Sequence, residues 1–544
     1  MPPLSPAAVA AVLVLVPAAA FLLLRLLHEL LASPLRRFPG PPAARFTDLY
    51  RAAVTLRGRA ERHHRSWHAR YGPAVRVGPD AVLLSDPALI RHVYATKNAW
   101  LKTDFYRPND IPFNGGRIHN LFNARDHAWY DHYKRPIGNV FSLSRVLEME
   151  PLVDDTVAKF VRRIEAGWLS GGGQTRVVPM DEWLGYFAWD SICKITYGQH
   201  YGFIEQGRDV DGVIRNSKAG MRYFAPCSQI PWVDNYLDKN PYIRIGPRPM
   251  EAARAFSARV IVKYRAALSS TAAAAEDEKD EEEKKNKEKK NKDETGGVGG
   301  HLVERYFRVQ KTYPDTVDDA QIANYALLSL GAGGDTTAAA LRSALYLLAK
   351  SPVSYAVASA ELDRAALPLP VRYADAQRAR LPYLDACIRE SMRLFPGVAL
   401  APEREVPPGP GFTLPDGRVL PAGTKVGINP AVVCRDEAVF GTRYAVDDFV
   451  PERWLRLEGE SDEDWAARTK AMDVALDFTF GFGKRVCIGR NIAKLEIWKL
   501  MATLLTLFDI KLADPDHEWK CENYWFVYQS DMPMIITRKG SAKI

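Results

Sequence analysis

A mainly α-helical fold with a small β portion is what the sequence predicts, and two observations support it. Apolar residues recur with the helical period over long segments from about residue 151 onward, whereas strand-like runs are few and short. Strands and helices also do not alternate regularly, as a parallel α/β sheet would require. With 544 residues, of which 47% are hydrophobic and 25% charged, the chain can bury a large core and still enclose a bulky cofactor.

The predicted elements are distributed unevenly along the chain. Ala74–Val77 and Ala81–Leu84 are short apolar runs around Gly78-Pro79-Asp80 and predict a β-hairpin, and Thr424–Ile428 predicts a further strand. The helical period predicts helices over Pro151–Gly171, Asp181–Gly198, Met250–Leu268, Asp318–Ala349, Ser354–Ala366, Leu384–Leu394 and Ile492–Phe508.

The N-terminal part predicts a transmembrane helix. Residues 7–24 carry no charge and form an apolar run near the minimum length for spanning a bilayer, and Pro17 does not exclude a span. Arg25, Arg36 and Arg37 follow the run and place the rest of the chain in the cytoplasm. A cleaved signal peptide is the alternative, which the absence of a preceding Lys or Arg disfavours.

The division of the chain follows from this run and from one charged tract. Residues 1–37 are predicted as an N-terminal membrane anchor and residues 38–544 as one globular domain. Within that domain, residues 271–300 are predicted as an exposed loop insertion, because the stretch from Glu276 to Glu294 has no apolar residue with which to bury a face. A solvated helix extension supported by Glu–Lys pairs is the alternative.

Charge and cysteine usage exclude several classes of protein. The formal net charge of +8 suits a basic docking face for an acidic protein or an anionic membrane. The sequence has no interleaved basic and aromatic stripe of the kind that binds nucleic acid. The six cysteines are scattered without a CxxC pair, which disfavours a disulfide scaffold or a structural zinc site. Only Cys487 stands in a setting unlike that of a small buried hydrophobe.

The segment around Cys487 predicts a thiolate ligand. Three glycines surround the cysteine between Phe480 and Gly489, so the backbone can turn sharply and approach a flat ligand closely. Backbone N–H groups near the sulfur and the N-terminus of the following helix would stabilise a thiolate. Arg485 can pair with a carboxylate at the edge of the ligand. Cysteine is the thiolate ligand that donates electron density to haem iron.

This segment matches the FxxGxRxCxG haem-binding signature of the cytochrome P450 family, which the chain resembles over nearly all of its length after the anchor. The resemblance implies a haem b cofactor with Cys487 as the axial ligand of the iron. It also places Phe480, Arg485 and Gly489 around that cofactor. The implied fold is a mainly α single domain with a small β-subdomain, in which haem lies between two long helices.

Finer stretches resemble the pisatin demethylase-like group of filamentous fungi. They are Asn120-Leu121-Phe122 through Phe141-Ser142-Leu143-Ser144, and the run from Cys487 to Glu496. The resemblance implies a membrane-bound enzyme of the endoplasmic reticulum whose catalytic domain faces the cytoplasm. Such members mostly tailor secondary metabolites.

Asp335-Thr336 resembles the family's acid–alcohol pair, which relays protons to dioxygen. The pair follows Gly333-Gly334 within the long helical segment. Mid-helix glycines cost ~1 kcal/mol each relative to Ala, and here they predict a place where the helical hydrogen bonds open. The resemblance therefore implies a catalytic role for Asp335 and Thr336. A kinked core helix with an incidental Asp is the alternative.

Two further motifs resemble a structural network of the family. Glu390 and Arg393 match ExxR, and their spacing puts both side chains on one helical face. The PERW motif contains Arg453, and the resemblance implies that Arg453 joins the other two in a buried network behind the haem.

The residues for the haem propionates follow the family less closely. An early helix of the family offers Trp or His and then Arg, and these positions here are Tyr130 and Lys134. Which of the two serves is left open. Arg404 stands where the family has another propionate-binding arginine.

The resemblance implies a monooxygenase that inserts one oxygen atom of dioxygen into an apolar organic substrate. Electrons would come from NADPH through a flavoprotein reductase, with a small haem protein as a further donor. Three alternatives are a member that rearranges its substrate, a member that detoxifies xenobiotics, and a non-catalytic haem protein. Asp335-Thr336 favours monooxygenation over rearrangement, because rearranging members often lack the pair.

Overall fold

The computed structural model describes residues 5, 13, 15–17, 19–20, 23–24, 26–113, 116–169, 176–248, 250–277, 300–377 and 380–540. Much of the predicted anchor, and residues 278–299 of the predicted insertion, lie outside this part of the chain. Within the described residues, none of the helices combines the length and the apolar character needed to cross a bilayer.

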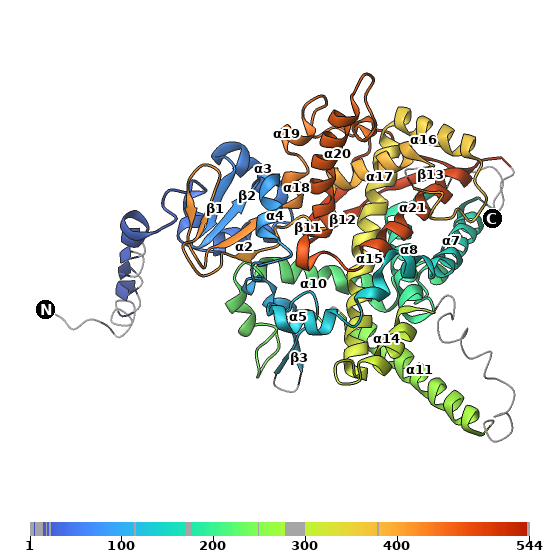
Figure 1. The fold of residues 1–544 in the computed structure, drawn as a ribbon, viewed down its shortest axis with the longest axis horizontal. Coiled ribbons are helices and arrows are strands. Elements are labelled where there is room, and N and C mark those ends of the chain that lie inside the picture. Colours follow the sequence, from blue (N-terminus) through green and yellow to red (C-terminus); the bar gives the residue numbers. More distant parts are fainter. Residues whose placement is uncertain are drawn as a thin grey trace.

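Helices form most of the molecule, and the long helix α15 runs through its middle (Figure 1). The longer helices are α2 (Leu49–Leu56), α3 (Ala60–Tyr71), α5 (His127–Lys134), α7 (Glu150–Ile164), α8 (Met180–Tyr197), α10 (Val213–Cys227), α11 (Glu251–Asp277), α14 (Leu302–Thr312), α15 (Asp319–Lys350), α16 (Pro352–Ala365), α17 (Pro382–Leu394), α20 (Asp462–Asp477) and α21 (Arg490–Leu507). Short helices are α4 (Ile90–Val93), α6 (Leu143–Leu147), α9 (Phe203–Gln206), α18 (Pro430–Val433) and α19 (Glu437–Phe440).

The strands form small sheets, the largest of which has the order β1-β2-β9-β6. The predicted hairpin is confirmed, because β1 and β2 pair antiparallel, and β9 corresponds to the predicted third strand. The strands are β1 (Ala74–Gly78), β2 (Ala81–Leu84), β3 (Ile111–Phe113), β4 (Gly116–Ile118), β5 (Val177–Pro179), β6 (Arg404–Glu405), β7 (Phe412–Thr413), β8 (Val419–Leu420), β9 (Lys425–Ile428), β10 (Phe508–Leu512), β11 (Lys520–Tyr524), β12 (Phe526–Ser530) and β13 (Pro533–Arg538).

Helices α8 and α15 form the centre of the core. Most residues of α8 are buried, including Trp189 and Ile192, as expected of a helix that is covered on all sides. A Cβ atom on Gly333 would lie 2.6 Å from the Ile192 side chain, and one on Gly334 would lie 2.5 Å from the Trp189 ring. Helix α15 is continuous, so the predicted opening is wrong. The glycines instead allow α8 to approach α15 closely.

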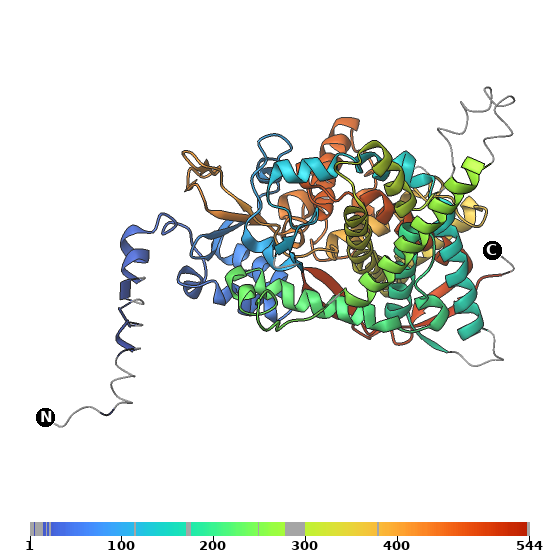
Figure 2. The same ribbon diagram turned by 90° about the horizontal axis from the view of Figure 1, so that it is seen from below.

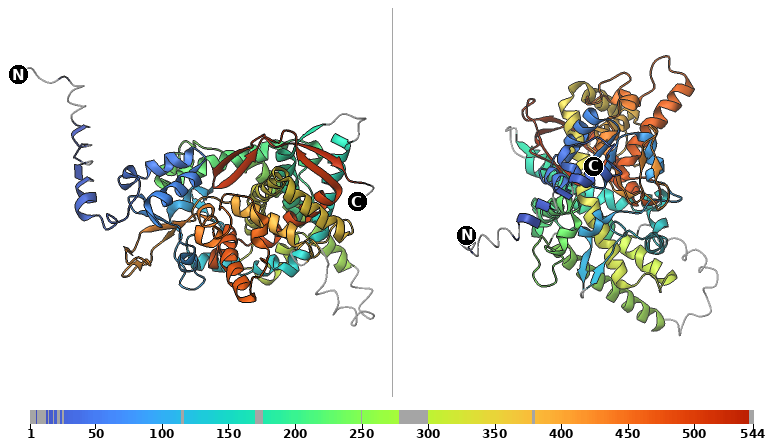
Figure 3. Two further views of the ribbon diagram at one scale, coloured as in Figure 1. Left: turned by 90° about the horizontal axis from the view of Figure 1, so that it is seen from above. Right: turned by 90° about the vertical axis from the view of Figure 1, so that its left-hand side faces the viewer.

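The described N-terminal helical turns project from the body of the molecule (Figures 2 and 3), and a buried side-chain contact ties this segment to the body. Glu29 accepts two hydrogen bonds from the guanidinium group of Arg76, at 2.6 and 3.0 Å, and both side chains are buried. Ser33 and Leu35 are buried as well. Part of residues 1–37 is therefore packed on the globular domain.

The predicted loop insertion begins later than expected. Helix α11 continues to Asp277, so residues 271–277 are helical. The run of alanines from Ala272 to Ala275 explains the extension, because alanine has the highest helix propensity.

Candidate active site

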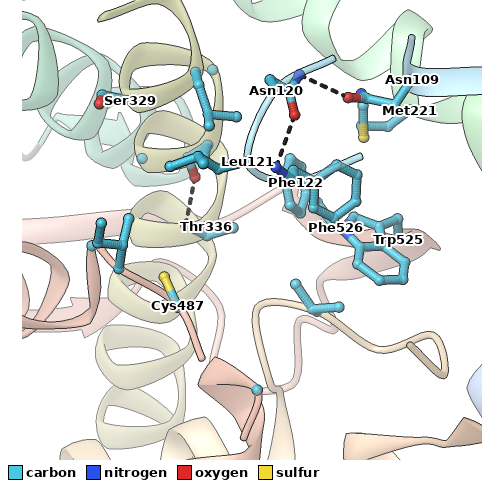
Figure 4. Close-up of a pocket in the computed structure, with 18 of the residues that line it drawn as sticks. Asn109, Asn120, Leu121, Phe122, Met221, Ser329, Thr336, Cys487, Trp525 and Phe526 are labelled. Carbon is cyan, nitrogen blue, oxygen red and sulfur yellow. Dashed lines mark hydrogen bonds between the residues drawn. The ribbon is translucent and has the colours of Figure 1, made fainter. Parts of the chain in front are cut away.

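A cavity of about 580 Å³ lies between α15 and the loop that precedes α21. Cys487 and Thr336 lie on one side of this cavity, and the rings of Phe122, Trp525 and Phe526 lie on the other (Figure 4). These segments are far apart in the sequence and meet only in the folded chain.

The backbone around Cys487 holds its sulfur in place. The amide of Cys487 donates to the carbonyl of Phe480 at 2.7 Å. Gly483 has a φ of 59°, and a Cβ there would lie 2.0 Å from a carbonyl oxygen of Tyr94, so only glycine suits this turn. The Cys487 sulfur is accessible from the cavity, and the nearby backbone N–H groups of Gly489 and Arg490 favour its anionic form. Burial raises the pKa of Cys487, whereas these donors lower it.

Two of the predicted propionate-binding arginines line the cavity. Arg485 is stacked 3.6 Å above the ring of Tyr130, and its Nε and Nη1 atoms are buried without a hydrogen-bond partner in the described part of the chain. Arg404 donates to the hydroxyl of Tyr106 at 3.1 Å. Unsatisfied guanidinium donors at the wall of a cavity are suited to a carboxylate ligand.

Tyr130 and Lys134 share one acceptor. The Tyr130 hydroxyl and the Lys134 ammonium both donate to the carbonyl of Lys484, at 3.1 and 3.2 Å. Tyr130 lines the cavity, whereas Lys134 does not. Tyr130 is therefore the better placed of the two to reach a ligand in the cavity.

Asp335 and Thr336 project in different directions from α15. The Thr336 hydroxyl donates to the carbonyl one turn earlier at 2.8 Å, and the residue lines the cavity. Asp335 is buried and does not line it. Its carboxylate accepts from Trp189 at 3.0 Å, from Ser217 at 2.8 Å and from Tyr528 at 2.9 Å. Ser217 does line the cavity, so its hydroxyl connects the Asp335 carboxyl group to that space.

The structure brings Glu390, Arg393 and Arg453 together as the resemblance implied. Arg393 forms two hydrogen bonds of 2.8 Å with the Glu390 carboxylate, and Arg453 donates to it at 3.3 Å. The indole of Trp454 adds a fourth donor at 2.8 Å. All four side chains are buried, so this network fixes the position of α17 in the core.

The sequence alone assigned no individual role to five residues of the site and its surroundings: Lys102, Ser217, Glu496, Tyr528 and Trp454. Glu496 accepts from Thr337 at 3.1 Å, and burial raises the pKa of Glu496 to about 8. Trp454 adjoins Arg453 in the PERW motif, which was the signal for this residue. Glu496 ends the run from Cys487 that resembles the fungal group, whereas Lys102, Ser217 and Tyr528 lie in segments without a motif of their own.

The residues of the cavity suit a haem group. A cysteine sulfur open to the cavity, unpartnered guanidinium atoms of Arg485 and an apolar wall match an iron ligand, a propionate partner and a flat macrocycle, respectively. Cys487 would hold the iron, while Arg485, Arg404 and Tyr130 would face the propionates. The fold and the cavity together define a haem-thiolate protein.

Comparison with known proteins identifies the family. The sequence matches the cytochrome P450 family over residues 41–536, so the chain belongs to it. Cytochrome P450 monooxygenase cfoH of Aspergillus candidus is 34% identical over 513 residues, which cover 94% of this chain and 90% of that protein. Cytochrome P450 monooxygenase cicH of Emericella nidulans is 33% identical over 513 residues, which cover 94% of this chain and 95% of that protein. Cytochrome P450 monooxygenase mpaDE of Penicillium roqueforti is 34% identical, and the match spans only 55% of that protein.

Proposed function

We propose that the protein is a haem-dependent monooxygenase that tailors an apolar organic molecule, as an oxidative step of fungal secondary metabolism. The observation that carries this proposal is that Cys487 and Thr336 line one largely apolar cavity, to which Ser217 connects the buried Asp335. The monooxygenase names of the fungal relatives support the same activity.

Haem with a thiolate ligand supplies, when bound, the activation of dioxygen for insertion of an oxygen atom into a C–H bond. The chain's own residues supply the surroundings. The amides of Gly489 and Arg490 favour the anionic form of the sulfur. Asp335 is the proposed proton source, Ser217 connects its carboxyl group to the cavity, and the Thr336 hydroxyl is a second group there that can exchange a proton. Phe122, Trp525 and Phe526 exclude water and contact an apolar substrate.

The remaining assignments concern partners and location. An NADPH-dependent flavoprotein reductase is the proposed electron source, with a small haem protein as a second donor. Lys134, Arg135 and Lys484 lie in segments near the cysteine side and suit an acidic partner, and Lys484 forms a partly exposed ion pair with Asp131. The apolar run of residues 7–24 and the arginines that follow it support a single-pass anchor in the endoplasmic reticulum.

Turnover with a cognate reductase tests the function. The substrate for this assay is the intermediate that accumulates in a knockout strain. We expect NADPH to be oxidised and this intermediate to be converted to an oxygenated product. Product formation without NADPH would instead support a rearranging enzyme, and haem binding without any turnover would support a non-catalytic haem protein. Conversion of foreign compounds alone would support detoxification.

A further inference from the structure

Lys102 is a buried lysine in the wall of the haem cavity. It precedes the short helical turn Asp104–Asn109, and an antiparallel β-bridge pairs it with Arg404. Only 5% of the residue is exposed. Its ammonium donates to the carbonyl of Phe122 and lies 4.2 Å from the centre of the Tyr106 ring.

Lys102 is one of three cations that meet at this part of the cavity. The other two are Arg404 and Arg485, which both act electrostatically on Lys102. Among the described residues, none of the three forms an ion pair with an Asp or Glu side chain. Burial and the two guanidinium groups lower the pKa of Lys102 well below its ordinary value. A buried cation that lacks an anionic partner is costly.

An anionic ligand would remove that cost. A lysine ammonium has three donors, and Lys102 uses one of them on the carbonyl of Phe122. If the proposed function holds, haem contributes two carboxylates to this cavity, against three cations. The nearby rings of Phe122 and Trp525 pack edge to face with centres 5.5 Å apart and give the cavity an aromatic wall that suits an aromatic ligand.

We propose that Lys102 is a carboxylate-binding residue of the haem cavity. The carboxylate belongs to a haem propionate or to an aromatic acid that the enzyme takes as substrate. Both sources require the same charge-assisted hydrogen bond, and the inference rests on the proposed function because each presupposes haem in the cavity.

Lys102→Met removes the ammonium while keeping the length of the side chain, and two measurements separate the sources. The first is the rate of haem transfer from the full-length holoprotein to excess apomyoglobin. A propionate partner predicts a roughly tenfold faster transfer. The second is the shift of the Soret band during titration with 2-naphthoic acid and with its methyl ester. A substrate carboxylate predicts that the wild type prefers the acid roughly tenfold and that the variant loses this preference.

Two further variants complete the experiment. Lys102→Arg keeps the charge and should restore most of either effect, and Lys97→Met removes an exposed lysine nearby and should change neither. Two results together would overturn the proposal and leave Lys102 as a packing residue only. Lys102→Met would lose haem at the wild-type rate, and neither the wild type nor the variant would distinguish the acid from the ester. The band of the ferrous carbon monoxide complex reports Cys487 ligation separately, so its absence in the wild type would count against the proposed function instead.

Discussion

At the scale of single residues, Asp335 is subject to opposing effects. Burial raises the pKa of its carboxyl group, whereas the hydrogen bonds from Ser217, Tyr528 and Trp189 lower it, and the net shift is upward. A raised pKa makes a carboxyl group a better proton acceptor and keeps it protonated to a higher pH than an ordinary aspartate. Because Asp335 does not line the cavity, Ser217 is the member of this network that reaches it.

Ser217→Ala and Tyr528→Phe form a matched pair that tests this connection. Each removes one hydrogen bond to the same carboxylate oxygen, of 2.8 and 2.9 Å, but only Ser217 lines the cavity. We expect Ser217→Ala to lower product formed per NADPH and to raise peroxide, by up to ~10²-fold in coupled turnover. Tyr528→Phe should alter coupling little. The measurement uses the substrate that accumulates in the knockout strain, and equal coupling in both variants would show that Ser217 carries no proton.

Cys487→Ser should abolish the red-shifted Soret band of the ferrous carbon monoxide complex, because the serine oxygen replaces the thiolate that donates electron density. Difference spectroscopy of the purified variant measures it. Cys521→Ser is the control, because Cys521 lies in β11 and does not line the cavity. An unchanged band in Cys487→Ser would refute the ligand assignment.

The residues that could be predicted from the sequence differ from the others in how far along the chain their contacts lie. Cys487 was predictable because its glycines and Arg485 lie beside it in the chain. Ser217 and Tyr528 reach Asp335 across 118 and 193 residues of sequence, and neither has a local motif. Lys102 likewise meets Arg404 and Arg485, which lie far along the chain, only in the folded protein.

At the scale of elements, the contact between α8 and α15 depends on glycine. Helical periodicity located both helices to within a few residues, because each is long and apolar. The reason for Gly333-Gly334 could not be read from α15 alone, since it is the bulk of Trp189 and Ile192 on another helix. The small sheets were only partly predictable, because strands as short as β6 and β7 carry no clear period.

Gly334→Ala should destabilise the fold although alanine favours helix. The added Cβ would lie 2.5 Å from the Trp189 ring, and such overpacking costs ~1–3 kcal/mol in the free energy of unfolding. Gly331→Ala on the same helix is the control, because the nearest atom is the flexible end of Met250 at 3.2 Å. That variant should gain up to ~1 kcal/mol. Thermal unfolding of both variants provides the comparison, and equal stability would contradict the packing explanation.

The Glu390 network predicts a large effect on stability. Glu390→Gln leaves the buried Arg393 and Arg453 without their carboxylate, which should cost ~3–5 kcal/mol in the free energy of unfolding. Arg107→Gln provides the control, because Arg107 and Asp104 have the same i,i+3 spacing but side chains that are 50% and 44% exposed. Its expected cost is below ~1 kcal/mol. Urea unfolding measures the free energy of unfolding of both variants. Comparable losses of stability would contradict the larger contribution expected from the buried network.

At the scale of the whole molecule, the N-terminal segment and the globular domain are joined by a buried ion pair. Arg76 lies in β1 and is fully buried, and Glu29 is the carboxylate that it contacts. The hydrophobic pattern of the sequence sets the end of the apolar run but cannot show where packing on the domain begins. Because Glu29 already belongs to that packing, a truncation that is meant to remove only the proposed anchor has to keep residue 29.

Two truncated chains therefore have different expected properties. A chain beginning at His28 should lose carbonate-resistant association with membranes, since the apolar run of residues 7–24 is gone, and should keep its stability. A chain beginning at Pro39 should also lose membrane association, but Arg76 would then be buried without Glu29, at a cost of ~3–5 kcal/mol in the free energy of unfolding. Arg76→Met in the shorter chain should recover much of that loss, because it removes the stranded charge.

Membrane fractionation and urea unfolding of all three proteins measure these effects separately. Carbonate-resistant association of the chain beginning at His28 would contradict the single anchor, and equal stability of the two truncated chains would contradict the importance of the ion pair.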